Sequence, residues 1–418
     1  MASKPNKGEQ FESRVARVLM AEGAFVRRRV NLEDQFAERF TITDLDIMAF
    51  FISPTLGFTK VIGECKTTEA RNAPSAGDRL LWSAGLASLV SADRTFIAVS
   101  KKARPNERRL ASLLDSEILD DADLRRREEV LGIGPNNYFG PQDPALNQLR
   151  DAARKLAKSD EHLRRVERFV GSELWLLPPV PGLKKAFGAC RRLSERWSAR
   201  LPQEERQPIE WLAAEAILGA VLHLVQLGGA GYRQPEGVFS QTMHERFAEG
   251  LADYQSLRQI SGQVDKVVTA LLSRIGVDPT QAVDALGVFE PQPPAYLEPL
   301  TELVERLARQ PRAAAGIAQV ADARYAEWLG ADGKVEVPTA TPEADRLLRL
   351  IASFMEGQIG VQGQLLAPMK GMDVPGSHRS QAVNSKGSPD QTEEGPAGEP
   401  AQTSFDDSDA PASRETAA

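Results

Sequence analysis

Charged residues interrupt two apolar, strand-like runs near the start of the chain. The run I-T-D-L-D-I-M-A-F-F carries Asp44 and Asp46, and the run V-I-G-E-C-K-T-T carries Glu64 and Lys66. A charge inside a sheet is costly unless it is paired, hydrated or bound to a metal. These four residues are therefore the first candidates for a functional site.

The spacing of the four residues determines which of them lie on the same face of a strand. Side chains alternate between the two faces, so Asp44 and Asp46 share one face, and Glu64 and Lys66 share one face of the next strand. The segment S-P-T-L-G at 53–57 is typical of a turn and would pair the two strands as a hairpin. All four groups would then gather at one end of a sheet.

Three carboxylates at one place repel each other unless a cation lies among them. Carboxylate oxygens suit Mg²⁺, which keeps several waters and also binds phosphate oxygens, and Mn²⁺ is an alternative. Such a metal activates a water and offsets the charge that builds on a phosphate. Lys66 can orient or deprotonate the water and stabilise the added negative charge.

The pattern D-L-D…G-E-C-K, preceded by F-E-S-R-V-A-R-V-L on a first helix, resembles the PD-(D/E)xK restriction-endonuclease-like superfamily. Within it the pattern is most similar to the Mrr-type and Holliday-junction-resolvase-type nucleases. The resemblance covers roughly residues 8–115. It departs from the usual motif in three ways: no proline precedes the aspartate, Cys65 fills the variable position, and residues 71–92 contain no glutamine.

The resemblance assigns a role to each of these residues. It implies Asp46 and Glu64 as metal ligands and Lys66 as the catalytic lysine. Glu12 matches a helix glutamate that holds metal or water. Asp44 is either a second ligand or the true match, with Asp46 in support.

The segments around the motif alternate between helical and strand-like patterns. Apolar residues at helical spacing, beginning with Phe11 and Val15, predict an amphipathic first helix. The expected order is helix 8–23, strands 24–30, 42–52 and 59–65, helix 78–91, strand 95–100 and helix 104–114. This order predicts a mixed sheet flanked by helices, an α/β core of the restriction-endonuclease-like kind that the resemblance implies.

Three parts follow one another along the chain. Residues 1–132 form the nuclease-like domain, and the Gly-, Pro- and Asn-rich segment after them is typical of a linker. Residues 145–365 are expected to be all helical and have no recognisable motif, and residues 370–418 are expected to form a disordered acidic tail. The expected helices are 145–170, 183–199, 208–227, 239–256, 258–275, 296–309 and 343–358, with a turn at G-G-A-G-Y, 228–232.

The net charge of −7 on 418 residues is concentrated at the C-terminal end. Residues 371–418 hold three basic and nine acidic side chains, so the rest is nearly neutral and can carry basic patches. Two cysteines do not make a disulfide framework, which favours a reducing cytoplasm. No run of about 18 uncharged apolar residues indicates a membrane span. The most apolar segment, 209–227, is expected to be a buried core helix.

Basic side chains flank the proposed site in two segments. The first is Arg27–Arg29, with Arg28 as the candidate DNA-phosphate contact, and the second is K-K-A-R-P-N-E-R-R, with Lys101, Lys102 and Arg104. Such groups position a duplex without reading its sequence. Each cluster is equally typical of a solvated charged face.

The site chemistry and the resemblance together predict a Mg²⁺-dependent DNA endonuclease, and the resemblance implies a role in defence against foreign DNA or in DNA repair. DNA is the expected partner, a homodimer would suit double-strand cleavage, and the helical region is a candidate for binding a protein partner. The alternative is a catalytically inactive, nuclease-like scaffold that binds protein or DNA. A simpler alternative is an edge strand with a Glu64–Lys66 surface pair that contributes under about 1 kcal/mol.

Overall fold

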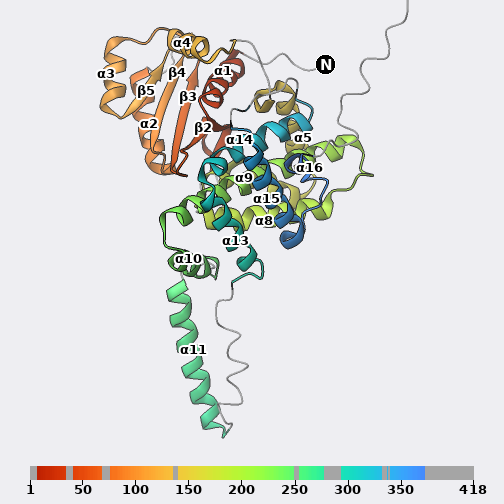
Figure 1. Ribbon diagram of the computed structural model, residues 1–418. Coiled ribbons are helices and arrows are strands. Elements are labelled where there is room, and N and C mark those ends of the chain that lie inside the picture. Colours follow the sequence, from red (N-terminus) through yellow and green to blue (C-terminus); the bar gives the residue numbers. More distant parts are fainter. Residues whose placement is uncertain are drawn as a thin grey trace, which may run out of the picture. The chain divides into compact units, whose positions relative to one another are not determined.

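The computed structural model describes residues 7–33, 41–67, 76–134, 140–248, 254–276, 293–331, 337 and 339–371. From residue 372 onward the predicted disordered tail lies outside the described residues. The described part consists of a mixed sheet with its own helices, followed by a helical region (Figure 1). An α/β part followed by helices is therefore confirmed.

The first part of the chain forms a five-stranded sheet in the order β1-β2-β3-β4-β5. Neighbours β1, β2 and β3 are antiparallel, whereas β4 pairs parallel with β3 and β5 pairs parallel with β4. The strands are β1 (Ala24–Glu33), β2 (Thr41–Ile52), β3 (Phe58–Lys66), β4 (Arg94–Val99) and β5 (Ser116–Leu119). The first four were predicted to within a few residues.

Four helices accompany this sheet. They are α1 (Lys7–Ala21), α2 (Ala76–Val90), α3 (Pro105–Leu113) and α4 (Asp121–Leu131). Two elements were not predicted: β5, which has only four residues, and α4, whose sequence is mostly charged. Asp120, which precedes helix α4, is its N-cap. The Asp120 side chain accepts hydrogen bonds from the N–H groups of Ala122 and Asp123.

The predicted hairpin of β2 and β3 is present. Its turn is closed by the Ser53 N–H, which donates to the Gly57 carbonyl at 2.9 Å, and by the Leu56 N–H, which donates to the Ser53 carbonyl at 2.8 Å. The register places Ile47 opposite Gly63. This pairing sets the positions of the charged residues that follow on both strands.

The turn also explains the glycines that were expected to form a turn of their own at 228–232. That expectation was wrong, because these residues lie inside helix α9 (Gln203–Arg233). A Cβ at Gly229 would lie 2.4 Å from the Leu56 carbonyl oxygen. The glycines therefore let the hairpin turn approach the helix closely.

The helical region surrounds α9. Its other helices are α5 (Pro144–Ala157), α6 (Glu161–Arg168), α7 (Leu174–Leu176), α8 (Pro179–Arg196), α10 (Glu236–Ala248), α11 (Tyr254–Arg274), α13 (Leu297–Arg309), α14 (Pro311–Trp328), α15 (Pro342–Phe354) and α16 (Ala367–Lys370). The helix expected at 145–170 is divided between α5 and α6, and α14 lies in the region expected to be helical, although its own bounds were not predicted.

Helix α9 is long and apolar enough to cross a membrane by composition, the one such helix among the described residues. Within the protein, 89% of its most apolar window is buried. Helices α5, α8, α13 and α14 pack against it. The prediction of a buried core helix at 209–227 is confirmed.

The two faces of the sheet pack against different partners. Val15 and Leu19 of α1 share a hydrophobic cluster with Ile47 and Val61 of the sheet. On the other face, Phe25, Met48, Phe50 and Ile62 belong to the same continuous core as the helices α8, α9 and α14. The end of the hairpin that carries the charged residues is therefore supported from both sides.

Gly63 lies where β3 passes under a buried ring, and its replacement should disturb both stability and the neighbouring site. A Cβ there would lie 2.0 Å from the Phe96 ring, which is 3% exposed. We expect Gly63→Ala to lower the free energy of unfolding by about 1–3 kcal/mol, the usual effect of overpacking. Urea unfolding measures this. Gly85→Ala on helix α2, where nothing lies within 4 Å, should instead be neutral or stabilising; equal behaviour of the two variants would contradict the account.

Candidate active site

Three of the predicted residues meet where β2 and β3 diverge at the end of the hairpin. The Lys66 Nζ lies 3.0 Å from Glu64 Oε1 and 3.6 Å from Asp46 Oδ2. The backbone N–H of Cys65 donates to Asp46 Oδ2 at 2.7 Å. One cation and one backbone donor therefore hold the two carboxylates in a fixed arrangement.

Burial tunes the protonation of this group. The side chains of Asp46 and Glu64 are 12% and 16% exposed, and that of Lys66 is 35% exposed. Burial raises the pKa of Asp46, although the Cys65 N–H and Lys66 oppose this. Burial alone would lower the pKa of Lys66, but Asp46 and Glu64 outweigh it and raise that pKa. Lys66 is therefore a cation at neutral pH, and it is better suited to stabilise negative charge than to remove a proton.

Glu64 has a second cationic neighbour and one open oxygen. Arg79 of helix α2 donates to Glu64 Oε1 at 2.7 Å. The other oxygen, Oε2, is buried and has no hydrogen-bond partner among the described residues. A buried carboxylate oxygen without a partner is costly, so this atom is available to a water or a cation. Arg79 was missed by the sequence analysis; its only signal was a basic residue at the start of the helix that follows E-C-K.

Asp44 lies beside this group at a more exposed position. Together with Asp46 and Glu64 it lines a cavity of about 20 Å³, which Trp82 and Ser83 of α2 also line. That volume suffices for a single water-sized occupant. Asp44, Asp46 and Glu64 thus reach one small space, as the hairpin predicted.

The resemblance implies Mg²⁺, and the donor chemistry at this end of the hairpin fits such a hard cation. Asp46 and Glu64 supply carboxylate oxygens, one of them open, and Asp44 adds another at the cavity. Within the described part of the chain, however, no three His, Cys, Asp or Glu side chains are placed to hold a metal together. The residues fit the ion by type and location, without a completed ligand set.

Glu12 of α1 is held by an arginine from β1. The Arg29 Nε lies 2.9 Å from Glu12 Oε2, and its Nη1 lies 2.8 Å from Glu9 Oε1. The charge of Glu12 raises the pKa of Asp46, although burial, the Cys65 N–H and Lys66 have larger effects on that pKa. Glu12 is therefore electrostatically coupled to the group, although Arg29 is its direct partner.

Arg29 itself has an unusual backbone. Its φ is 58°, in the left-handed region, although it lies within a strand. The register of β1 and β2 pairs Arg28 with Ile47 and Val30 with Leu45, which leaves Arg29 across from Asp46. A non-glycine residue in such a conformation costs of order 1–3 kcal/mol, and such strain often lies at functional sites. The ion pairs of Arg29 with α1 offset that cost.

The predicted DNA-phosphate contacts lie in two different environments. Lys101, Lys102 and Arg104 are exposed. The Ser100 N–H donates to the Lys66 carbonyl at 3.1 Å, so their segment begins at the same end of the strands as Lys66. Arg28 is largely buried and hydrogen-bonds to neighbouring side chains. The nearby Arg27 is 8% exposed. It is therefore neither part of a solvated face nor accessible to a duplex.

Removing the charge of Asp46 should stabilise the protein while it disrupts the site. Because the folded-state pKa of Asp46 is raised, the ionised carboxylate is disfavoured in the folded chain. This disadvantage is absent below the ordinary aspartate pKa and is fully expressed once the pH exceeds the folded pKa. We expect Asp46→Asn to unfold at higher denaturant than the wild type near neutral pH, with the difference disappearing in acid. A destabilised Asp46→Asn at neutral pH would show that the carboxylate is mainly structural.

Comparison of the chain with protein-family models, with curated proteins and with solved structures finds no match. What the site does must therefore be inferred from its own chemistry and geometry. Two carboxylates, a protonated lysine and an open carboxylate oxygen lie at one strand end.

Proposed function

We propose that this protein is a Mg²⁺-dependent DNA endonuclease with a restriction-endonuclease-like core, acting in defence against foreign DNA or in DNA repair. The observation that supports this most is the contact of Lys66 with both Asp46 and Glu64 at the end of the hairpin. Partly burying three charged side chains together carries a desolvation cost, which ion pairs in a purely structural strand offset only in part. Catalysis gains from such an arrangement, since fixed charges in a dry site act strongly on a transition state.

In this proposal each residue has a separate task. Asp46 and Glu64 would hold the cation, which supplies positive charge to the phosphate when it is bound. Lys66, a cation that is 35% exposed, would stabilise the negative charge that builds on the scissile phosphate. Glu12 is a candidate for orienting the attacking water once Arg29 shifts from it. Lys101, Lys102 and Arg104 would contact the flanking phosphates.

The second candidate function is a non-catalytic scaffold that binds protein or DNA. Two ion-paired carboxylates favour this function. Glu64 pairs with both Lys66 and Arg79, and Glu12 pairs with Arg29. In that case the same ion pairs would serve only to hold α1, α2 and the hairpin together. Activity measurements separate the two functions.

The test is cleavage by the purified full chain in Mg²⁺, in Mn²⁺ and in EDTA. The substrates are supercoiled plasmid, linear duplex, single-stranded DNA and RNA, because the site chemistry suits any phosphodiester. We expect plasmid nicking or linearisation that requires the metal and stops with EDTA. If no substrate is cut in either metal and calorimetry detects no Mg²⁺ binding, the scaffold function is the correct one.

A further inference from the structure

The arginines of β1 differ in how their charges are neutralised. Arg27 lies between two carboxylates: its Nε is 3.1 Å from Glu215 Oε2 of α9, and its Nη2 is 3.0 Å from Asp322 Oδ1 of α14. Arg29 has two carboxylate partners on α1. Arg28, between them in the sequence, has no carboxylate within ion-pair distance among the described residues.

Arg28 is instead held by neutral acceptors. It donates to Ser13 Oγ at 2.6 Å and to Asn147 Oδ1 at 3.2 Å. Burial and the nearby charge of Arg150 lower the pKa of Arg28 to about 10. The charges of Glu12 and Glu9 oppose this decrease only in part. The guanidinium of Arg28 is therefore desolvated, and its charge is not fully compensated.

Arg150 repeats this situation from the facing helix. It lies on α5 one turn after Asn147, and its side chain is 13% exposed. Its Nε is buried without a hydrogen-bond partner, and the nearest carboxylate, on the largely exposed Asp151, is 4.0 Å away. Burial and the charges of Arg154 and Arg29 lower its pKa. The charges of Asp151 and Glu215 oppose this decrease only in part. A second buried guanidinium thus lacks a close carboxylate partner.

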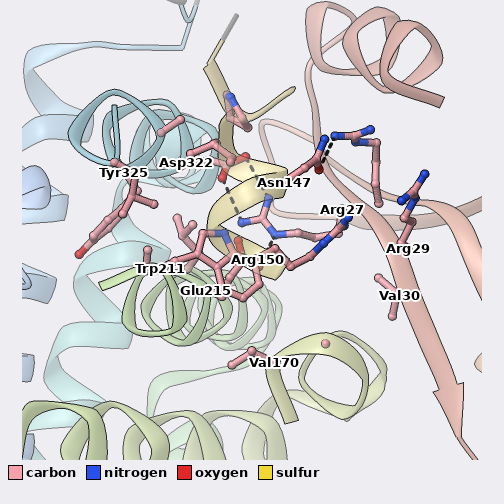
Figure 2. A pocket seen from close by; sticks show the side chains of 18 of the residues that line it. Arg27, Arg29, Val30, Asn147, Arg150, Val170, Trp211, Glu215, Asp322 and Tyr325 are labelled. Carbon is pink, nitrogen blue, oxygen red and sulfur yellow. Dashed lines mark hydrogen bonds and ion pairs between the residues drawn. The ribbon is translucent and has the colours of Figure 1, made fainter. Parts of the chain in front are cut away.

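Arg28 and Arg150 both line one cavity between β1 and the helices α5, α9 and α14. Figure 2 shows Arg150, Asn147 and the ion-paired group of Arg27, Glu215 and Asp322 among the residues that line this cavity. The cavity measures about 90 Å³. Since a water occupies about 30 Å³ in the liquid, the space accepts a few waters or one small oxyanion.

We propose that this cavity binds a phosphate group, held by the guanidinium groups of Arg28 and Arg150. The arginine fork matches the oxygens of phosphate and can bind them through two parallel hydrogen bonds. A phosphate dianion would neutralise both charges, as the carboxylates of α9 and α14 neutralise Arg27. This site does not depend on the proposed nuclease activity.

The phosphate group can come from two sources with the same chemistry. One is inorganic phosphate or a small phosphate monoester, and the other is the terminal phosphate of a nucleic-acid strand. A phosphodiester inside a duplex carries a single charge and is flanked by sugars on both sides, so it fits a cavity of this size poorly. The small, free form is the one that the cavity favours.

Calorimetry and thermal melting of the full chain in EDTA test the site. Sodium phosphate is compared with sodium chloride at equal ionic strength, for the wild type, Arg150→Met and Arg191→Met. The exposed Arg191, paired with Glu195 on α8, is the matched control. Phosphate should bind the wild type and the control and raise their melting temperatures above the values in chloride. Arg150→Met should weaken binding by about ten- to a hundredfold, because it loses hydrogen bonds to a charged group.

Arg150→Met should also melt no lower than the wild type when phosphate is absent, since it removes a buried cation that lacks a close carboxylate partner. A purely structural arginine would behave in the opposite way. The proposal is overturned if phosphate stabilises the protein no more than chloride does, or if Arg150→Met binds it like the wild type. Competition by a short 5′-phosphorylated oligonucleotide, but not by its 5′-hydroxyl form, would identify a strand end as the source; competition by neither would identify the small molecule.

Discussion

Arg27→Ala is expected to lower the free energy of unfolding by about 3–5 kcal/mol, the usual effect of breaking a buried ion pair from one side. Arg27 joins β1 to α9 and α14 through Glu215 and Asp322, and its guanidinium lies 4.2 Å from the centre of the Phe25 ring. Without it, two carboxylates remain buried with no cation between them. Burial already raises the pKa of both carboxyls, so the variant should lose most stability where both are ionised and should recover partly as falling pH protonates them.

Urea unfolding across the pH range measures this effect. The control is Arg125→Ala, which removes an arginine that is 74% exposed and paired with Asp121 on the surface of α4. That pair should contribute no more than about 0.5 kcal/mol. If Arg27→Ala is as stable as the control, the sheet and the helical region do not depend on this ion pair.

Lys66→Met is expected to reduce plasmid cleavage by about a hundred- to a thousandfold, the range found when one charge-stabilising donor is removed from an active site. Methionine keeps much of the length of the side chain but removes the cation that contacts Asp46 and Glu64. The fold should persist, because Arg79 still pairs with Glu64 and the Cys65 N–H still bonds to Asp46.

Lys102→Met is the matched control, since Lys102 is exposed and follows the strand beside Lys66. Loss of a phosphate contact of this kind should weaken DNA binding mildly and reduce the salt dependence of binding without abolishing turnover. Equal losses in the two variants would mean that Lys66 only attracts nucleic acid and takes no part in the chemistry.

The hairpin and its charged residues could be predicted because the signals are local. Side chains alternate along 42–52 and 59–65, so Asp46 shares a strand face with Asp44, and Glu64 shares one with Lys66. The turn between the two strands then brings these faces together. The mixed sheet followed from the order of helical and strand-like segments. The remaining elements lacked such signals: β5 is four residues long, and the charged α4 has few apolar positions that repeat.

The missing part of the site depends on contacts between distant segments. Asp322 lies 295 residues from Arg27, on a helix whose bounds were not predicted, so the burial of Arg27 could not be inferred from its neighbours in sequence. Gly228 and Gly229 resembled a turn because their close approach to Leu56 is visible only in the folded chain. The left-handed conformation of Arg29 has no sequence signal, since arginine rarely adopts it.

The most direct measurement is the nicking of supercoiled plasmid in Mg²⁺ by the wild type, Asp46→Asn and Glu64→Gln, each verified to be folded. Both substitutions keep side-chain size and remove one carboxylate charge from the end of the hairpin. We expect metal-dependent nicking by the wild type and loss of it in both variants. Equal nicking by all three proteins would place the active site elsewhere, and no nicking by the wild type in Mg²⁺ or Mn²⁺ would contradict the nuclease function.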